Sequence, residues 1–95
     1  MRVIIREAAY DDLDRIYSWI AKDRPHSANL VIERILENVE RLGRFPYMGH
    51  IGRVRGTHEW VVPGLPNIVV YTIDSGANEL AIVAVFHGAQ NREEK

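Results

Sequence analysis

The chain has 95 residues, of which 46% are hydrophobic and 26% are charged, a formal net charge of -1 and no cysteine. This length predicts a single domain over residues 1–95, and the residue balance excludes a disordered or fibrous chain. The lack of cysteine excludes a disulfide framework and a thiolate metal site, and no apolar run is long enough for a signal peptide or a membrane span. We therefore expect a cytoplasmic protein without membrane association.

The first half of the chain carries helical patterns. Residues 3–6 are predicted to form a short strand, after which apolar side chains recur at helical spacing as Leu13, Ile16, Tyr17 and Ile20. Asp11 and Asp12 precede this stripe, where carboxylates suit the positive end of a helix dipole. Pro25 suits the first position of a second helix, and Gly43 suits a left-handed cap at its end. The stripe of this second helix comprises Ala28, Val31, Ile32, Ile35, Leu36, Val39 and Leu42.

The second half carries strand patterns. Residues 59–62 are a short strand candidate, which the turn dipeptide at 63–64 closes. Residues 68–73 and 80–86 are β-branched or apolar, and the turn residues 74–78 join them, which predicts an antiparallel hairpin. We therefore expect an α+β fold in which the helical hairpin covers one face of the sheet.

Residues 41–58, in the least regular part of the sequence, contain no acidic residue. Their basic and imidazole side chains are Arg41, Arg44, His50, Arg53, Arg55 and His58. Because functional groups concentrate on loops held by a rigid scaffold, this stretch is a candidate surface for a phosphate-rich partner. Solvation of an ordinary surface loop is the competing interpretation. The domain has no basic excess, so a nucleic-acid role would have to be local or rely on a larger assembly.

A group of ionisable side chains is predicted to converge where the strands end. These candidate site residues are Arg53, Arg55, His58, Glu59, His87 and Arg92. Cleavage of RNA needs a base for the 2′-hydroxyl, cations to stabilise charge on the phosphorane and an acid for the leaving oxygen. Glu59 or His87 could be the base, the arginines the electrostatic clamp and His87 the acid. Solvated and structural roles compete with this interpretation, since any small α+β protein has such groups near strand ends.

Several familiar sites are excluded. The sequence has no phosphate-binding loop and no dinucleotide-binding fingerprint, its histidines lack the spacing of a zinc protease, and no carboxylate-rich loop resembles a calcium site. We therefore expect neither a cofactor nor a metal. Trp60 and Tyr71 could stack on a base, although aromatic residues in strands more often belong to the core.

The order of several short motifs resembles the RelE/ParE superfamily of toxins from bacterial type II toxin–antitoxin modules. The motifs lie at residues 8–13, 16–21, 45–50, 56–64, 69–71 and 85–89. The resemblance implies a helical hairpin packed on a twisted, mainly antiparallel sheet. It also implies a small protein that arrests growth and is neutralised by a cognate antitoxin, part of which folds over it.

Activity within the superfamily divides into two classes. RelE-like members cut messenger RNA on the ribosome, whereas ParE-like members inhibit DNA gyrase. Nuclease positions would correspond to Arg53 and Arg55 in the basic loop, Glu59 and His87 as acid–base groups, and Arg92 in the tail.

This chain departs from the nuclease pattern. It has His58 where relatives often have arginine, it has no aromatic residue after His87, and its net charge is low for a ribosome-bound enzyme. The sequence therefore slightly favours gyrase inhibition, with a ribosome-dependent endoribonuclease as the alternative. A third possibility is a member that only binds its antitoxin. No coiled-coil heptad or self-complementary patch is apparent, so no oligomeric state is predicted.

Overall fold

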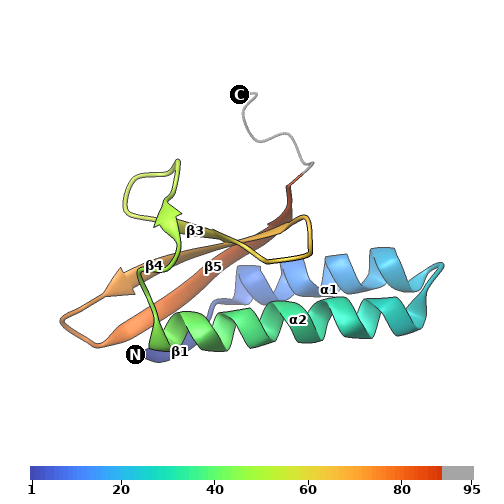
Figure 1. The fold of residues 1–95 in the computed structure, drawn as a ribbon, viewed down its shortest axis with the longest axis horizontal. Helices are drawn as coiled ribbons and strands as arrows, with labels where there is room; N and C mark the ends of the chain where they lie inside the picture. Colours follow the sequence, from blue (N-terminus) through green and yellow to red (C-terminus); the bar gives the residue numbers. More distant parts are fainter. Residues whose placement is uncertain (89–95) are drawn as a thin grey trace.

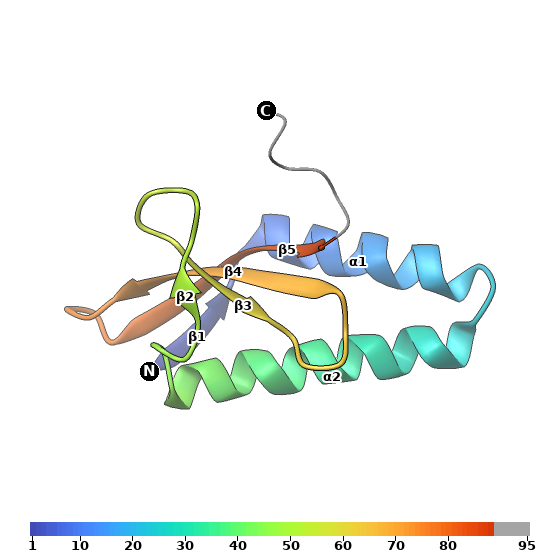
Figure 2. The same ribbon diagram turned by 45° about the horizontal axis from the view of Figure 1, so that its top comes forward.

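The computed structural model describes residues 1–88 and places two helices against one face of a five-stranded sheet (Figures 1 and 2). The elements in chain order are β1 (Arg2–Ile5), α1 (Glu7–Ala21), α2 (Pro25–Arg44), β2 (His50–Ile51), β3 (His58–Val61), β4 (Asn67–Asp74) and β5 (Glu79–His87). The predicted helical hairpin and the predicted β4–β5 hairpin are both present. The α+β class expected from the sequence is therefore confirmed.

The sheet has the strand order β1-β5-β4-β3-β2. β1 pairs with β5 in parallel, and the other neighbouring strands are antiparallel. β1 and β2 therefore lie at opposite edges of the sheet, and β2 occupies a segment in which the sequence predicted only a loop. Its two residues pair with β3, so they extend the sheet where the basic stretch crosses it.

The sequence indicated the start of α2 better than the start of α1. Pro25 is the first residue of α2, as predicted, where its missing N–H leaves no helical hydrogen bond unmade. α1 begins earlier than its apolar stripe suggested, at Glu7, so the acidic side chain in its first turn is Glu7. The prediction that Asp11 and Asp12 lie at the positive end of the helix was therefore wrong, because both lie in the second turn.

Gly43 has a role that the sequence did not indicate. The expected left-handed cap at Gly43 was wrong, because α2 continues through this residue to Arg44. A Cβ atom built on Gly43 would lie 2.7 Å from Val3 Cγ2 and 3.2 Å from the carbonyl oxygen of Met1. Glycine is required here because the last turn of α2 packs directly against β1.

β5 contains an extra residue that reverses the direction of the side chains after it. Val70 of β4 pairs with Ala84, whereas the next residue, Tyr71, pairs with Ile82, so Val83 has no partner on β4. Ile82 and Val85 both lie in the core, although strict alternation would place them on opposite faces. Because of this bulge, the side chains after Val83 point to the opposite face of the sheet from the one that strict alternation along β5 would give them.

The core lies between the helices and the sheet. Its buried side chains are Ala9, Leu13, Ile35, Val39, Leu42, Val62, Val69, Tyr71, Leu80, Ile82 and Val85. A polar contact crosses this layer where Trp60 Nε1 donates to Asn38 Oδ1 at 2.9 Å, while Asn38 Nδ2 donates to the carbonyl oxygen of Arg34. Within residues 1–88, neither helix combines the length and the hydropathy needed to cross a bilayer.

Candidate functional site

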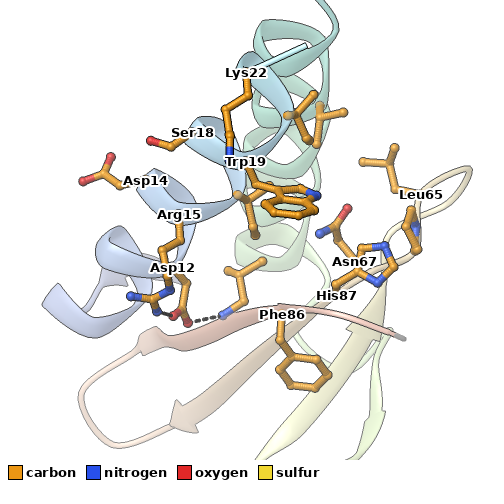
Figure 3. Close-up of a pocket in the computed structure, with 15 residues that line it drawn as sticks. Asp12, Asp14, Arg15, Ser18, Trp19, Lys22, Leu65, Asn67, Phe86 and His87 are labelled. Atoms are coloured by element: carbon orange, nitrogen blue, oxygen red, sulfur yellow. Dashed lines mark hydrogen bonds and ion pairs between the residues drawn. The ribbon is translucent and has the colours of Figure 1, made fainter. Parts of the chain in front are cut away.

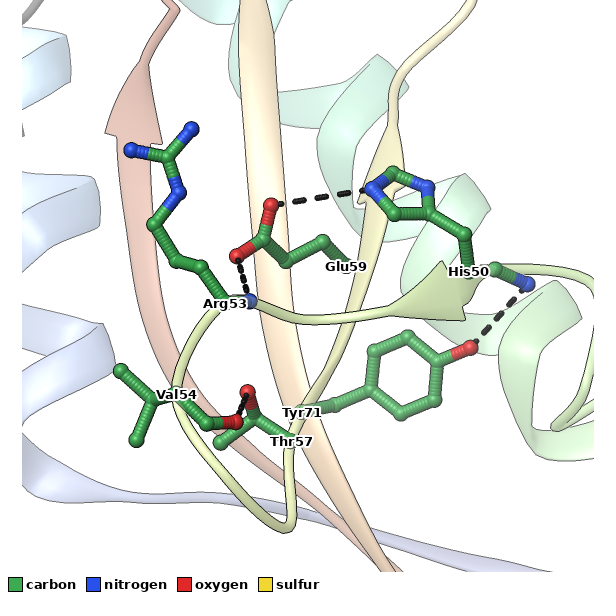
Figure 4. Close-up of polar contacts among 7 residues, drawn as sticks. His50, Arg53, Val54, Thr57, Glu59 and Tyr71 are labelled. Carbon is green, nitrogen blue, oxygen red and sulfur yellow. Dashed lines mark hydrogen bonds and ion pairs between the residues drawn. The ribbon is translucent and has the colours of Figure 1, made fainter. Parts of the chain in front are cut away.

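The basic stretch reaches the β2 edge of the sheet and forms the loop between β2 and β3 (Figure 4). Arg53 and Arg55 lie on this loop, and both side chains are exposed. The loop is closed by a hydrogen bond from Gly52 N–H to the carbonyl oxygen of Thr57 and by a second from the Thr57 hydroxyl to the carbonyl oxygen of Val54, at 2.6 Å. The two arginines are therefore held on a closed loop at the edge of the sheet.

Glu59 anchors this loop to the sheet. Its side chain is only 6% exposed, and Oε2 accepts a hydrogen bond from the backbone N–H of Arg53 at 3.2 Å. The other oxygen, Oε1, lies 3.8 Å from Nε2 of His50 on β2 (Figure 4). A buried carboxylate needs such partners, because desolvation penalises its charged form. Glu59 and Arg53 are therefore brought together, as predicted, and Glu59 holds the backbone of the loop.

His58 lies within an aromatic cluster. Its ring stacks on Tyr71, with the centroids 5.3 Å apart, and meets the edge of Tyr47 at 5.9 Å. Its Nδ1 atom is buried and has no hydrogen-bond partner within the part of the chain that the structure describes. The surroundings of His58 are therefore those of a packing residue, with Tyr71 on one side and Tyr47 on the other.

Tyr71 connects the core to the segment before β2. It is fully buried, which confirms the predicted core position, and its hydroxyl donates to the carbonyl oxygen of Pro46 at 2.7 Å and accepts from Gly49 N–H at 3.2 Å. Burial raises the pKa of this hydroxyl above its usual value of 10.0, while the hydrogen bond from Gly49 acts in the opposite direction. A Cβ on Gly49 would lie 2.7 Å from the carbonyl oxygen of Glu59, so only glycine allows this close approach.

His87 and Glu59 lie on opposite faces of the sheet. Trp60, the neighbour of Glu59, reaches α2 through Asn38, so the side chain of Glu59 points to the face without helices. His87 shares the helix-covered face with Val85, because the two residues are two apart after the bulge. The predicted convergence of the two groups was therefore wrong. Arg92, the remaining candidate, lies outside the described residues.

On its own face, His87 borders a groove between α1 and the adjoining ends of β4 and β5 (Figure 3). The groove has a volume of about 970 Å³. Its apolar lining comprises Ile16, Trp19, Ile20, Val31, Leu65, Pro66, Val85 and Phe86. Trp19 is 74% exposed and lies opposite Asn67 and His87 in Figure 3, and Lys22 Nζ stands 5.3 Å from the centre of its ring. An apolar cleft of this size can accept the side chains of a bound protein segment.

Asp12 lies at one end of this groove and accepts a backbone hydrogen bond from β5. β1 pairs with β5 only as far as Ile82, and beyond that point Asp12 Oδ2 accepts the backbone N–H of Val85 at 2.8 Å. Asp12 also pairs with Arg15 one turn later in α1. A carboxylate from the helix therefore takes the place of the missing strand partner.

Sequence reasoning named His87 but did not predict a groove beside it, although one signal was present. Trp19 is adjacent to Ile20 and outside the apolar stripe of α1, and an exposed tryptophan is uncommon in a small domain. Asp12 gave no comparable signal, because its partner is a backbone group 73 residues away. In the described part of the chain, no group of three or more histidine or carboxylate side chains is arranged to hold a metal ion.

Comparison with known proteins gives consistent results. Residues 3–92 match the family model described as the ParE toxin of the type II toxin–antitoxin system parDE. The chain is 36% identical over 78 residues to the Sinorhizobium fredii protein described as "Putative toxin Y4kP", and the match covers 82% of this chain and 78% of that protein.

Solved structures share the fold. A chain of the chromosomal ParDE toxin–antitoxin system from P. aeruginosa superposes with a TM-score of 0.81 at 21% identity, over 92% of this chain and 95% of that chain. The isolated RelE toxin of E. coli superposes with a TM-score of 0.69 at 10% identity, over 96% of this chain and 87% of that chain. The superpositions establish a common fold. At these low identities they do not identify the target of this chain.

Proposed function

Since the chain belongs to the ParE toxin family of type II toxin–antitoxin systems, we propose that it arrests growth by inhibiting DNA gyrase. The observation that carries this choice of target is the separation of Glu59 from His87 on the two faces of the sheet. A gyrase target also implies action in the cytoplasm, where chromosomal DNA is supercoiled.

Cleavage of RNA by general acid–base catalysis requires the base and the acid to reach the same phosphodiester. Glu59 is buried, and its two oxygens are directed to Arg53 N–H and toward His50 Nε2. His58 is packed between two tyrosine rings, and His87 borders the groove on the other face. This arrangement supports a toxin that acts by binding its target and disfavours a nuclease built on these groups.

The alternative is a ribosome-dependent mRNA endoribonuclease. It draws support from Arg53 and Arg55, which stand exposed on one closed loop and could clamp a phosphate. Under this alternative, His87→Ala should slow RNA cleavage by about 100-fold if His87 is a general acid or base. A loss below about threefold would assign His87 a structural role.

We infer that a cognate antitoxin is the second partner and that it occupies the groove beside α1. A flat exposed tryptophan and a largely apolar lining suit the apolar face of an amphipathic segment that folds on binding. Trp19→Ala should preserve growth arrest and abolish rescue by the coexpressed antitoxin, because truncating a central aromatic residue typically costs about 2 kcal/mol or more of binding free energy. Undiminished rescue of the Trp19→Ala strain would exclude the groove as the docking site.

The proposed target is tested with purified components and in cells. The purified chain should inhibit ATP-dependent supercoiling of relaxed plasmid by DNA gyrase, and induction without antitoxin should cause DNA breaks while messenger RNA stays intact. Codon-phased cuts in messenger RNA with normal DNA topology would instead support the nuclease. Unchanged growth on induction would support a member that only binds its antitoxin.

A further inference from the structure

The segment that joins α2 to the β2–β3 loop forms an exposed strip along the β2 edge of the sheet (Figure 2). We call residues 44–55 the edge strip. Its exposed side chains are Arg44, Phe45, Tyr47, His50, Ile51, Arg53, Val54 and Arg55. The exposed fractions of its large apolar members are 56% for Phe45, 66% for Tyr47, 82% for Ile51 and 64% for Val54. Several large apolar side chains are therefore left in water within one short segment.

The edge strip contains no acidic residue. The carboxylate that follows it, Glu59, is buried beneath the loop and directed at Arg53 N–H and His50. Glu59 therefore lies against Arg53 and His50, whereas Arg44 and Arg55 make no ion pair within residues 1–88. A partner that docks here must supply carboxylates or other anionic groups to gain from electrostatic complementarity.

The composition of the strip favours a protein partner over a nucleic acid. Binding sites on proteins are enriched in tyrosine, phenylalanine and arginine, and such residues dominate their binding energy. A nucleic-acid surface draws its affinity from many phosphate contacts, yet this chain has a formal net charge of -1. Half of the exposed side chains of the strip are apolar. Contact with phosphate groups would not remove aliphatic side chains such as Ile51 and Val54 from a polar environment, so their burial would not be favoured.

The backbone of the strip is held in place before any partner arrives. The hydroxyl of Tyr71 bonds both Pro46 and Gly49, and Glu59 holds the N–H of Arg53. The hydroxyl of Thr57 closes the loop on Val54. A surface that is already ordered loses less conformational entropy on binding, which raises the affinity that its few contacts can provide.

We propose that the edge strip is the surface through which the toxin binds its target, and that it takes an acidic protein surface of DNA gyrase with apolar sockets for Tyr47 and Ile51. This inference rests on the proposed function and adds the surface and the chemistry of the contact. The groove beside α1 lies elsewhere on the molecule, so target and antitoxin would use different surfaces.

The test compares two triple variants of the full chain. The strip variant carries Arg44→Glu, Ile51→Ala and Arg55→Glu. The matched control carries Arg6→Glu, Arg24→Glu and Leu30→Ala, which make two charge reversals and one truncation of a large aliphatic side chain at exposed positions outside the strip. Each protein is titrated into a supercoiling assay with purified gyrase and into a direct binding assay with gyrase without DNA. Thermal melting confirms that both variants are folded.

We expect the strip variant to need at least tenfold more protein for half-inhibition and for half-saturation of gyrase, whereas the control should stay within twofold of the wild type. Raising the salt concentration should weaken binding by the wild type, whereas it should not weaken binding by the strip variant, because Arg44→Glu and Arg55→Glu turn the attraction into a repulsion that salt screens. The titration is repeated with a fluorescent 20-base-pair DNA duplex as the probe.

The outcomes separate the two levels of the proposal. Equal inhibition by the strip variant and the wild type would overturn the strip as the binding surface and leave gyrase as the target. Tight binding of the DNA duplex by the wild type, lost in the strip variant, would overturn the protein partner in favour of nucleic acid. Failure of the wild type itself to inhibit gyrase would overturn the proposed function together with the target assigned to the strip.

Discussion

The substitution Tyr71→Phe measures how firmly the segment before β2 is held to the core. It keeps the buried ring and removes a hydroxyl that donates to the carbonyl oxygen of Pro46 at 2.7 Å and accepts from Gly49 N–H at 3.2 Å. Each hydrogen bond contributes about 0.5–1.5 kcal/mol net, and a buried group left without a partner costs about 1–3 kcal/mol. We therefore expect the free energy of unfolding to fall by about 2–3 kcal/mol.

Urea unfolding followed by tryptophan fluorescence measures this loss, and thermal melting should show a midpoint lowered by at least about 8 °C for a domain of this size. Tyr10→Phe is the matched control, because Tyr10 lies on α1 and is 54% exposed. The control should change the free energy of unfolding by less than about 0.5 kcal/mol. If Tyr71→Phe also lowered the free energy of unfolding by less than about 0.5 kcal/mol, the argument that these hydrogen bonds hold the segment would be refuted.

The raised pKa of Tyr71 adds a dependence on pH. Because the folded pKa lies above the unfolded value near 10.0, the protonated hydroxyl stabilises the fold below pH 10, and this contribution is lost as the pH rises through the folded pKa. The stability difference between the wild type and Tyr71→Phe should therefore narrow above pH 10. A difference that widened with pH would contradict the raised pKa.

The remaining predictions concern three other contacts, of which the first two are measured with the same unfolding assay. Gly43→Ala should destabilise the chain by about 1–3 kcal/mol through its clash with Val3, although alanine is normally favoured over glycine inside a helix; a stabilised variant would refute the close approach. Asp12→Ala should cost about 1–3 kcal/mol, since it leaves the N–H of Val85 without its acceptor, and hydrogen exchange at that amide should speed up. Glu59→Ala should release the β2–β3 loop, seen as faster proteolysis within it, and unaltered protection would assign the loop's order to other contacts.

The parts of the fold that depend on local pattern could be predicted from the sequence. The two helices and the β4–β5 hairpin follow from apolar periodicity and from turn residues that are close in the chain. The pairing of β1 with β5 and the short strand β2 depend on partners far away or on only two residues, for which local pattern carries no signal. Gly43 was misjudged for the same reason, because its neighbour Val3 is distant in sequence.

The candidate site could be predicted only where its residues are close along the chain. Arg53 and Glu59 are joined by a loop, so their proximity followed from the strand boundaries. The face of the sheet on which His87 lies is set by the bulge at Val83, which shifts the alternation of all side chains after it. Without the extra residue, His87 would face the side of the sheet that carries Glu59. The prediction failed because nothing in the apolar run 80–86 marks the bulge.

The bulge also bears on how chains of this fold diverge. Insertion or deletion of a single codon in β5 would exchange the faces of every side chain after it, while Leu80 and Ile82 kept their places in the core. Such an event could move a histidine into or out of reach of the carboxylate on β3 without changing either residue. Two relatives with identical candidate residues can therefore differ in chemistry through a one-residue gap in their alignment, and that gap is the place to look when their activities disagree.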